Sequence, residues 1–333
     1  MELQLKKAVL TGGSGPIGLA LIRKLLKENI EILLLQRENS VRRIYLPDDE
    51  RLHIKYCELD QLKNFMYEEQ DFDVFFHLGW TNKGRAMREN LEEQNKNISY
   101  SCDAVELAHR LGCHSFIGAG SQAEYGRRME ALSAHTVCTP ESAYGVAKLC
   151  AGHETRILCQ RYGIRHVWTR ILSGYGIYDN MDSVLISPIL NSMKGKKLEF
   201  SKGEQIWDFI YLDDLANALY LIAKKGKPNA IYPIGSGEAR PLKEYIEILC
   251  SKLGKLDEME LGKIPYSKTQ VMHLEADIEL LQEDTGWKPE VKFEDGIDEV
   301  IDFYKYWKAE WETKYQERLK EVTGNERMEI GKV

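Results

Sequence analysis

A glycine-rich turn between a strand pattern and a helix pattern constrains the fold of this chain more than any other feature. Residues 9–18 read VLTGGSGPIG, with an apolar run first and Pro16 where a first helical residue is favoured. Gly12 permits a tight turn, Gly15 lets backbone approach a phosphate, and Gly18 lets the helix pack closely. Strand, turn and helix in this order predict dinucleotide binding through a pyrophosphate. The residues predicted to line that phosphate are Gly12, Gly15, Pro16, Ile17 and Gly18.

Short apolar runs alternate with amphipathic stretches through the first half of the chain. Strands are predicted at 8–11, 31–35, 74–78, 115–119 and 166–171, and helices at 17–27, 90–111 and 143–162. This alternation is typical of a parallel sheet with crossover helices, and the apolar strands indicate helices on both faces. The predicted fold class is α/β, a Rossmann-type doubly wound parallel sheet with a smaller C-terminal α/β lobe.

The texture of the sequence changes after Gly174, where segments become shorter and richer in Gly, Pro, Lys and Glu. Residues 207–225 are an exception, because a strand pattern there leads into an apolar helix that we expect to return to the sheet. The helix from Trp307 onward is expected to be solvated and to fray near Gly324. The predicted units are 1–172 with 207–225 for the sheet domain, 173–206 and 226–315 for a substrate-binding lobe, and 316–333 for a charged tail.

Charge and composition exclude several classes of function. The net charge of −7 and pI of about 5.7 disfavour a nucleic-acid partner. No apolar run reaches the ~18 residues of a membrane span, and the first residues lack a signal-peptide layout. The seven cysteines form no C-x-x-C pair, which favours reduced thiols in a cytoplasmic protein. No metal site is expected, since His77, His114 and His153 lack ligand spacing.

The segment after the second predicted strand carries no acidic residue at its start. It reads Gln36, Arg37, Glu38, Asn39, Ser40, followed by two further arginines. NAD-specific folds usually place a carboxylate there for the ribose 2′-hydroxyl, whereas a guanidinium such as that of Arg37 suits a 2′-phosphate. This favours NADP(H) over NAD(H), although a solvated basic loop would look the same. Arg37 and Ser40 are therefore cofactor-binding candidates, and Glu58 at the end of a later strand could reach the adenine.

A phenol and an ammonium lie four residues apart on a predicted helix, at Tyr144 and Lys148. Such residues share a helix face, and a nearby cation favours the phenolate, whose ordinary pKa near 10 is too high for a base at neutral pH. Ser121, at the end of the preceding strand, could orient a carbonyl oxygen. Alone, the Tyr/Lys spacing is usually a surface helix and the serine a cap. Their positions after the glycine turn give them weight.

The ordered set of motifs resembles the extended short-chain dehydrogenase/reductase family, in its nucleotide-sugar epimerase, dehydratase and reductase group. The resemblance covers about residues 6–305. It rests on the glycine turn, DVFFHLG at 73–79, Asn97, SQAEYG at 121–126, the Tyr144/Lys148 pair, RILSGYG at 170–176, WDFIYLDD at 207–214 and GWKP at 286–289.

The resemblance implies roles for residues at the matching positions. Tyr144 would exchange the proton of a sugar hydroxyl, Lys148 would hold the cofactor ribose, and Ser121 would polarise the reacting oxygen. Further cofactor-binding positions are Leu59, Leu78, Gly79 and Asn97. Further substrate-binding positions are Trp80, Gln122, Ser173, Trp207 and Lys268.

Departures from the family pattern narrow the expected chemistry. Family dehydratases carry an acidic pair directly after the catalytic Ser or Thr, where this chain has Gln122 and Ala123, so a 4,6-dehydratase is disfavoured. Glu124 lies one position beyond the two at which family dehydratases carry their acidic pair. Trp207 replaces an arginine that contacts the substrate diphosphate in family epimerases, and Ser173 replaces a common asparagine.

We therefore expect NAD(P)-dependent oxidoreduction at C4 of a nucleotide-linked sugar. One reading is a 4-keto (often 6-deoxy) sugar reductase that uses NADPH, and the alternative is a C4 epimerase with tightly held NAD(P). A non-catalytic cofactor-binding regulator is a remote third, and a serine hydrolase is weak because Ser121 lacks a G-x-S-x-G setting. A homodimer through helices 90–111 and 143–162 is expected, as is common in the family.

Overall fold

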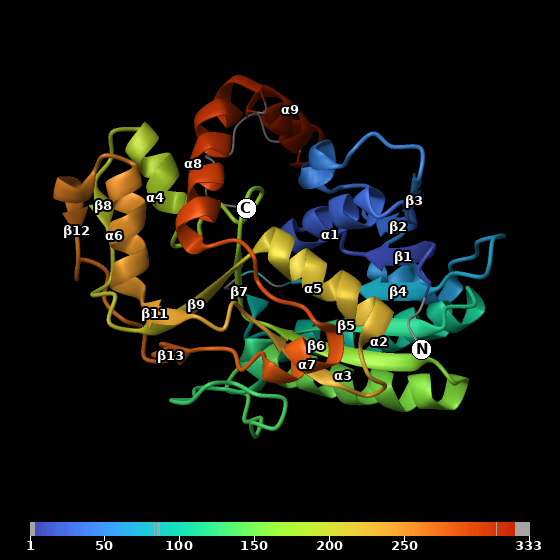
Figure 1. Cartoon of the computed structure of the whole chain (residues 1–333). Helices are drawn as coiled ribbons and strands as arrows, with labels where there is room; N and C mark the ends of the chain where they lie inside the picture. Colours follow the sequence, from blue (N-terminus) through green and yellow to red (C-terminus); the bar gives the residue numbers. More distant parts are fainter. Residues whose placement is uncertain (1–3, 83, 85–86, 311, 324–333) are drawn as a thin grey trace.

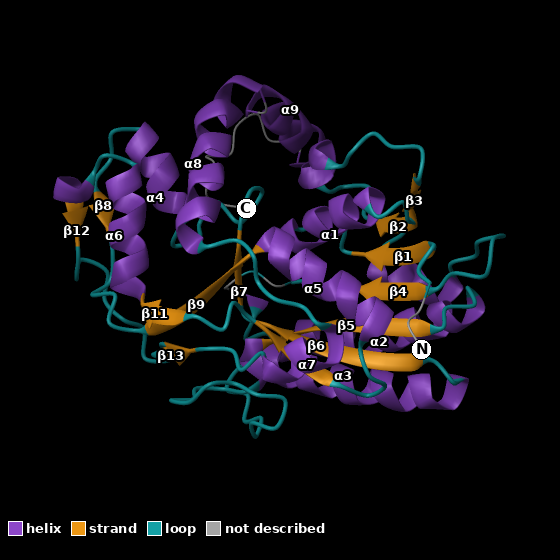
Figure 2. Ribbon diagram, in the orientation of Figure 1, coloured by secondary structure: helices purple, strands orange, loops and turns teal. Residues whose placement is uncertain are grey.

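The computed structural model describes residues 4–82, 84, 87–310 and 312–323, apart from the side chains of 307–310 and 312. Among these residues, one sheet of seven parallel strands has the order β10-β6-β5-β4-β1-β2-β3 (Figures 1 and 2). This confirms the predicted Rossmann-type sheet. Its strands are β1 (Lys7–Thr11), β2 (Glu31–Gln36), β3 (Leu52–Tyr56), β4 (Val74–His77), β5 (Ser115–Ser121), β6 (Arg165–Ile171) and β10 (Ile231–Ile234).

Successive residues of β1 face opposite sides of this sheet, and each side is covered by a pair of helices. Val9 packs with α2 and α3, whereas Ala8 and Leu10 pack with α1 and α5. Figure 1 shows α1 beside α5 and α2 beside α3. Burial on both faces explains why the strands are almost wholly apolar. These helices are α1 (Pro16–Lys27), α2 (Leu91–Arg110), α3 (Ala143–Tyr162) and α5 (Leu212–Lys225).

A smaller lobe lies beyond the carboxyl ends of these strands and has its own aromatic core. Tyr175, Phe209, Tyr245 and Phe293 pack ring against ring there, next to a sheet in which β9 pairs with β7, β11 and β13. The elements of this lobe are β7 (Ser173–Tyr175), α4 (Ile186–Met193), β8 (Leu198–Glu199), β9 (Ile206–Tyr211), β11 (Ala239–Pro241), α6 (Leu242–Lys252), η5 (Leu256–Glu258), β12 (Met259–Glu260), β13 (His273–Leu274) and α8 (Phe293–Glu310). The short helices η1 (Val41–Tyr45), η2 (Leu59–Asn64), η4 (Gln122–Glu124) and α7 (Glu279–Thr285) lie outside it.

The boundary between the two units differs in detail from the expected one. Within 207–225, α5 does return to pack on α1, but β9 pairs inside the smaller sheet. β10, which was expected in the smaller lobe with 226–315, pairs in parallel with β6 at the edge of the large sheet. β10 is difficult to predict from the sequence, because Pro233 interrupts its strand pattern. At a sheet edge it is tolerated, since one side of the strand needs no hydrogen-bond donor.

The C-terminal helix corrects the expectation of a solvated tail. α9 (Glu312–Thr323) packs on η1, and its side chains Tyr315 and Leu319 are buried. These two residues are four apart and so share one helix face. Their charged neighbours conceal this narrow apolar face in the composition. The expected fraying near Gly324 falls outside the described residues.

Three further observations concern the described part of the chain as a whole. None of its helices combines the length and apolarity that crossing a bilayer requires. Its His, Cys, Asp and Glu side chains form no group of three or more that could hold a metal ion. All seven cysteines are free thiols.

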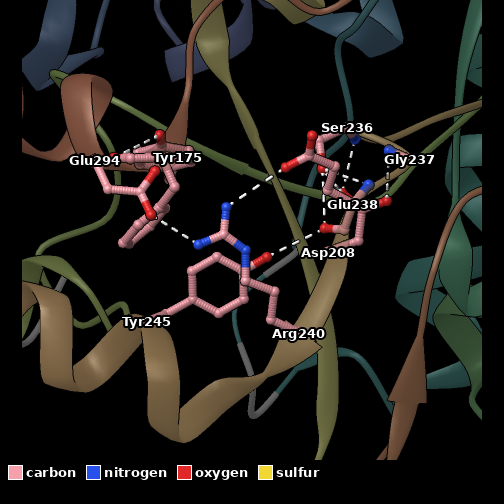
Figure 3. Close-up of polar contacts among 9 residues, drawn as sticks. Tyr175, Asp208, Ser236, Gly237, Glu238, Arg240, Tyr245 and Glu294 are labelled. Carbon is pink, nitrogen blue, oxygen red and sulfur yellow. Dashed lines mark hydrogen bonds and ion pairs between the residues drawn. The ribbon is translucent and has the colours of Figure 1, made fainter.

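Asp208 on β9 joins three chain segments of the smaller lobe. Its carboxylate accepts hydrogen bonds from the amide and hydroxyl of Ser236, both 2.7 Å, and from the amides of Gly237 and Ala276, both 3.1 Å (Figure 3). Burial raises the pKa of Asp208, and these hydrogen bonds oppose that rise. The carboxylate therefore fixes the turn after β10 and the segment after β13 against β9.

Asp208→Ala should destabilise the fold, because it leaves three amides and a hydroxyl without their acceptor. At about 1–3 kcal/mol for each buried group left unsatisfied, we expect the free energy of unfolding to fall by about 3 kcal/mol or more. Urea unfolding measures this. Asp257→Ala, at an exposed position of η5, is the matched control and should change stability by less than about 0.5 kcal/mol. Equal losses in the two variants would contradict the bracing role of Asp208.

Candidate active site

The glycine turn closes tightly between β1 and α1. Gly12 has a φ of 77°, and a Cβ there would lie 2.7 Å from the backbone nitrogen of Gly79. A Cβ at Gly18 would lie 2.4 Å from the Gly12 carbonyl oxygen. The Gly15 amide donates to the same carbonyl at 3.1 Å, and α1 begins at Pro16. The first amides of α1 are thus left for a ligand, which fits the pyrophosphate of a dinucleotide.

The predicted cofactor-binding residues after β3 and β4 lie beside this turn. Leu78 and Gly79 follow β4, and their backbone atoms contact Gly12. The Leu59 side chain reaches Gly79 from η2. These positions lie together at the carboxyl edge of the sheet, and their contact with a cofactor stays a prediction.

Asn97 and Glu58 stand nearby but have structural partners. The buried Asn97 accepts hydrogen bonds at Oδ1 from the amide (2.8 Å) and hydroxyl (3.1 Å) of Thr81, so it fixes the loop after β4. Glu58 is the N-cap residue of η2, and its amide donates to the Gln61 side chain at 2.9 Å. For both, a direct contact with cofactor stays a prediction.

Neutral polar side chains occupy the end of β2. Gln36 is buried and donates from Nε2 to the Ser14 hydroxyl at 3.0 Å, and the Ser40 hydroxyl donates to Ser14 at 2.8 Å. Arg37, the next residue along, is exposed. The network joins the end of β2 to the glycine turn through neutral groups.

The predicted catalytic residues come together at the end of β5. Ser121 is the last residue of that strand, and Tyr144 and Lys148 lie on the first turns of α3. The N-cap Ser142 accepts from the Gly145 amide at 3.1 Å and so fixes where α3 begins. The Ser121 side chain acts to lower the pKa of the Tyr144 phenol, and the Lys148 ammonium donates to the Ala119 carbonyl at 2.6 Å.

Two residues around Tyr144 complete the site. The Trp80 ring meets the Tyr144 ring edge-on at 5.9 Å, and the Lys148 nitrogen lies 3.7 Å from the Trp80 ring centroid. The Arg88 guanidinium lies 4.6 Å from the Tyr144 ring centroid on the described part of the loop before α2. The Arg88 carbonyl accepts from the Tyr144 amide at 2.9 Å. Trp80 was predicted from the sequence as a site residue. Arg88 was not, because no spacing in the sequence connects it with α3.

The position of these cations changes the expected electrostatics. Burial raises the pKa of Tyr144, while Arg88 and the hydrogen bond with Ser121 act to lower it. From the sequence, Lys148 was expected to be the cation that lowers the pKa of Tyr144. In the structure Arg88 has the largest lowering effect, because Lys148 is turned toward Trp80 and Ala119.

Glu124, the acid nearest to Ser121 in sequence, is buried and turned away from the reacting groups. It accepts from the Arg170 Nε at 2.8 Å, the Trp168 indole at 3.0 Å and the Ser121 amide at 2.8 Å. These charge-assisted hydrogen bonds fix the Glu124 carboxylate in the turn that follows β5. Glu124 thus holds the backbone of Ser121 from within this buried cluster.

The two substitutions noted in the substrate region contact each other. The Trp207 indole on β9 donates to the Ser173 hydroxyl on β7 at 2.8 Å. Gln122 lies in η4 beside Ser121, and the Lys268 carbonyl accepts from Arg127 at 3.2 Å. Contacts of these residues with a substrate stay predictions.

His77, in contrast, belongs to the core. It bonds Thr11 at 2.9 Å and Ser101 at 3.1 Å, and burial lowers its pKa to about 3, with a smaller contribution from Lys148. The neutral imidazole, hydrogen-bonded at both ring nitrogens, links β4 to Thr11 on β1 and to Ser101 on α2.

Comparison with known proteins decides the family. The model of the NAD dependent epimerase/dehydratase family matches residues 8–235. The chain belongs to this family. The match confirms the resemblance and the enzyme class inferred from the motifs.

Individual members of the family are distant in sequence but similar in length. A dTDP-glucose 4,6-dehydratase of Escherichia coli K12 is 25% identical, over 90% of this chain and 92% of that protein. A dTDP-4-dehydro-6-deoxyglucose reductase of Escherichia coli is 24% identical, over 90% and 98%. The structure of a UDP-N-acetylglucosamine 4-epimerase from Methanobrevibacter ruminantium has a TM-score of 0.82 at 23% identity, covering 91% of this chain and 99% of that one. These matches show that the whole fold is shared.

Arg88→Gln should raise the pKa of Tyr144, because it removes the cation beside the phenol. A step in which Tyr144 gives up its proton loses rate as the pH rises through that pKa. The alkaline limb of the turnover profile should therefore move to higher pH, by roughly half a pH unit to one unit. Arg88→Lys should move it less. Arg161→Gln, at an exposed arginine at the far end of α3, should leave the limb in place. A limb that is the same in all four proteins would contradict this role of Arg88.

Proposed function

We propose that this enzyme is an NADPH-dependent reductase of a nucleotide-linked 4-keto, often 6-deoxy, sugar. The family and its relatives support oxidoreduction of nucleotide sugars by an enzyme with a nicotinamide cofactor. The relatives include a dTDP-4-dehydro-6-deoxyglucose reductase, matched over 98% of its length, beside a dTDP-glucose 4,6-dehydratase of Haemophilus influenzae matched over 97% of its length.

The engagement of Glu124 is the observation that carries this proposal. Elimination of water across a sugar ring needs an acid and a base beside the catalytic hydroxyl, and Gln122 and Ala123 supply neither. Glu124 is committed to Arg170 and Trp168 in a buried cluster. The groups that remain around the C4 position, Ser121 and Tyr144, can only orient an oxygen and transfer one proton.

The roles of these groups follow from their geometry. The Ser121 hydroxyl would hydrogen-bond the C4 oxygen, and the Tyr144 phenol would give it a proton as it becomes a hydroxyl. Arg88 and Ser121 limit the rise in the pKa of the phenol, which makes that transfer easier. Trp80 closes the site behind both Tyr144 and Lys148 and keeps water from the reacting oxygen. Bound NADPH would supply the hydride that reaches C4.

The cofactor is proposed from the glycine turn and from the residues that follow β2. Added Cβ atoms at Gly12 and Gly18 would collide with backbone, which fits a turn built to receive a pyrophosphate. Arg37 and Ser40 would bind the 2′-phosphate, and Lys148 the nicotinamide ribose. Solved structures of similar fold contain NAD, so NAD(H) is the alternative cofactor.

An epimerase is the second candidate, because a UDP-glucose 4-epimerase from Thermotoga maritima shares the fold with a TM-score of 0.80. The same three catalytic residues would serve that reaction. The two functions differ in whether the cofactor is consumed. We also retain the cytoplasm as the proposed compartment, which the seven free thiols support.

The test is to incubate the protein with UDP-, GDP-, CDP- and dTDP-linked 4-keto-6-deoxy sugars and NADPH. For at least one substrate we expect one NADPH to be consumed for each C4 hydroxyl formed. Tyr144→Phe should lower turnover by ~10²–10⁴ while cofactor binding is retained. Interconversion of sugars without net loss of NADPH would instead indicate the epimerase, and an unchanged Tyr144→Phe rate would remove Tyr144 from the mechanism.

A homodimer through α2 and α3 is the proposed assembly. The two helices lie side by side, and α3 exposes Val146 and Ile157 by 47% and 46%. These residues are eleven apart and so share a helix face, which would be covered by the same face of a second copy.

Sedimentation should therefore give the mass of two chains, and Ile157→Glu should shift it to one, because the variant places a charge in the apolar contact. Leu256→Glu makes the same change at a residue that is 48% exposed in the smaller lobe, and should leave the dimer intact. A single-chain mass for the unaltered protein would rule out this assembly.

A further inference from the structure

The last described helix crosses from the smaller lobe to the nucleotide-binding side of the large sheet. α9 follows α8 and lies over η1, the short helix after β2 (Figure 1). Its buried side chains Tyr315 and Leu319 share a core cluster with Tyr45 of η1. The contact between α9 and η1 is therefore part of a hydrophobic core. It brings the charged residues of α9 to the loop that follows Gln36.

Arg318 is the residue of α9 that reaches this loop most directly. Its guanidinium donates to the Glu38 carbonyl, two residues beyond Gln36, and pairs with Glu321 at 2.7 Å. The side chain is only 16% exposed, and its Nε–H is buried without a hydrogen-bond partner in the described part of the chain. Leaving a charged donor unsatisfied is costly, and Arg128 and Arg170 also each carry one buried guanidinium nitrogen without a partner among the described residues.

The loop that Arg318 contacts, at the end of β2, carries further polar and charged groups, among them the exposed side chain of Glu38. Ser14 and Ser40 bring two hydroxyls to the same loop, and Arg37 and Arg42 add charge. Arg42 lies near enough to Tyr315 to oppose the rise in the phenol pKa that burial causes. The carboxylate paired with Arg318 belongs to Glu321, which is mostly solvated and so screens the cation weakly.

We propose that Arg318 binds the 2′-phosphate of a dinucleotide, so that the C-terminal helix completes the cofactor site from the opposite lobe. The inference rests on the proposed use of NADPH and names the residue that would discriminate it from NADH. A phosphate monoester offers several acceptor oxygens, which match the parallel N–H donors of a guanidinium. Arg37 alone, exposed on the loop, would hold the phosphate from one side, and Arg318 would hold it from the other.

The experiment measures binding by titration calorimetry, with NADPH, NADH, adenosine 2′,5′-bisphosphate and 5′-AMP as probes. Arg318→Gln should weaken NADPH and the bisphosphate by about tenfold or more, and should leave NADH and 5′-AMP unchanged. Arg318→Lys keeps the charge but loses the fork of donors, and should fall between. Lys320→Gln removes the same charge from another side of α9 and should bind all four ligands as the unaltered protein does.

The outcomes separate this inference from the proposed function. If the unaltered protein prefers NADPH and Arg318→Gln keeps that preference, Arg318 is not a phosphate ligand, while the cofactor proposal stands. If Arg318→Gln weakens all four probes alike, the helix only supports the loop and the inference is overturned. If the unaltered protein does not prefer NADPH, the cofactor proposal fails first and takes this inference with it. A melting temperature for each variant shows that the fold is intact.

Discussion

Parallel pairing of β1 with β2 on one side and β4 on the other is the constraint on which the site depends. In this register Thr11 lies opposite Leu35 and His77, so the three strands end at one level. The glycine turn, the neutral network at Gln36 and the Leu78–Gly79 backbone then follow from neighbouring strand ends. A Cβ at Gly12 would lie 2.7 Å from the Gly79 nitrogen, so the two turns approach each other closely. A slip of one residue would exchange the β1 side chains that pack with α1 and α5 for those that pack with α2 and α3.

The buried ion pair of Glu124 and Arg170 links the turn after β5 to β6. Burying two charges is costly unless their hydrogen bonds are nearly complete. Here the carboxylate receives the guanidinium, an indole and the Ser121 amide, and the Arg170 guanidinium stacks over the Tyr125 ring at 4.6 Å, whereas Arg170 Nη1 is buried without a hydrogen-bond partner among the described residues. These contacts hold the catalytic serine and the loop behind it in place. The acid of SQAEYG is therefore part of a buried hydrogen-bond cluster next to Ser121.

What the sequence could and could not predict follows from how local each signal is. Gly12, Gly18 and the spacing of Tyr144 and Lys148 are set within one turn or one helix, and the fold places them as expected. Arg88 and β10 are different, because their partners lie far along the chain and the segments carry no periodicity of their own. α9 was misjudged for the same reason. Only the packing of Tyr315 and Leu319 on η1 shows that a charged, apparently solvated helix has a buried face. Long-range packing decides these positions, and a single sequence does not record it.

Lys148 was expected both to bind the cofactor ribose and to lower the pKa of Tyr144. In the structure, Arg88 has the larger lowering effect on that pKa. The Lys148 ammonium is held by the Ala119 carbonyl and the Trp80 face, which fixes it on the side of the sheet where a nicotinamide ribose would lie. Because it stands 5.9 Å from the Tyr144 ring centroid, with Trp80 edge-on to that ring, its field reaches the phenol weakly. Arg88 lies closer and reaches the same ring from the exposed loop before α2, so its effect depends on how that loop is held. The Tyr144 amide and the Arg88 carbonyl join the loop to the first turn of α3. The acidity of the phenol is thereby coupled to the conformation of a surface loop, whereas the Lys148 ammonium is held by β5 of the large sheet.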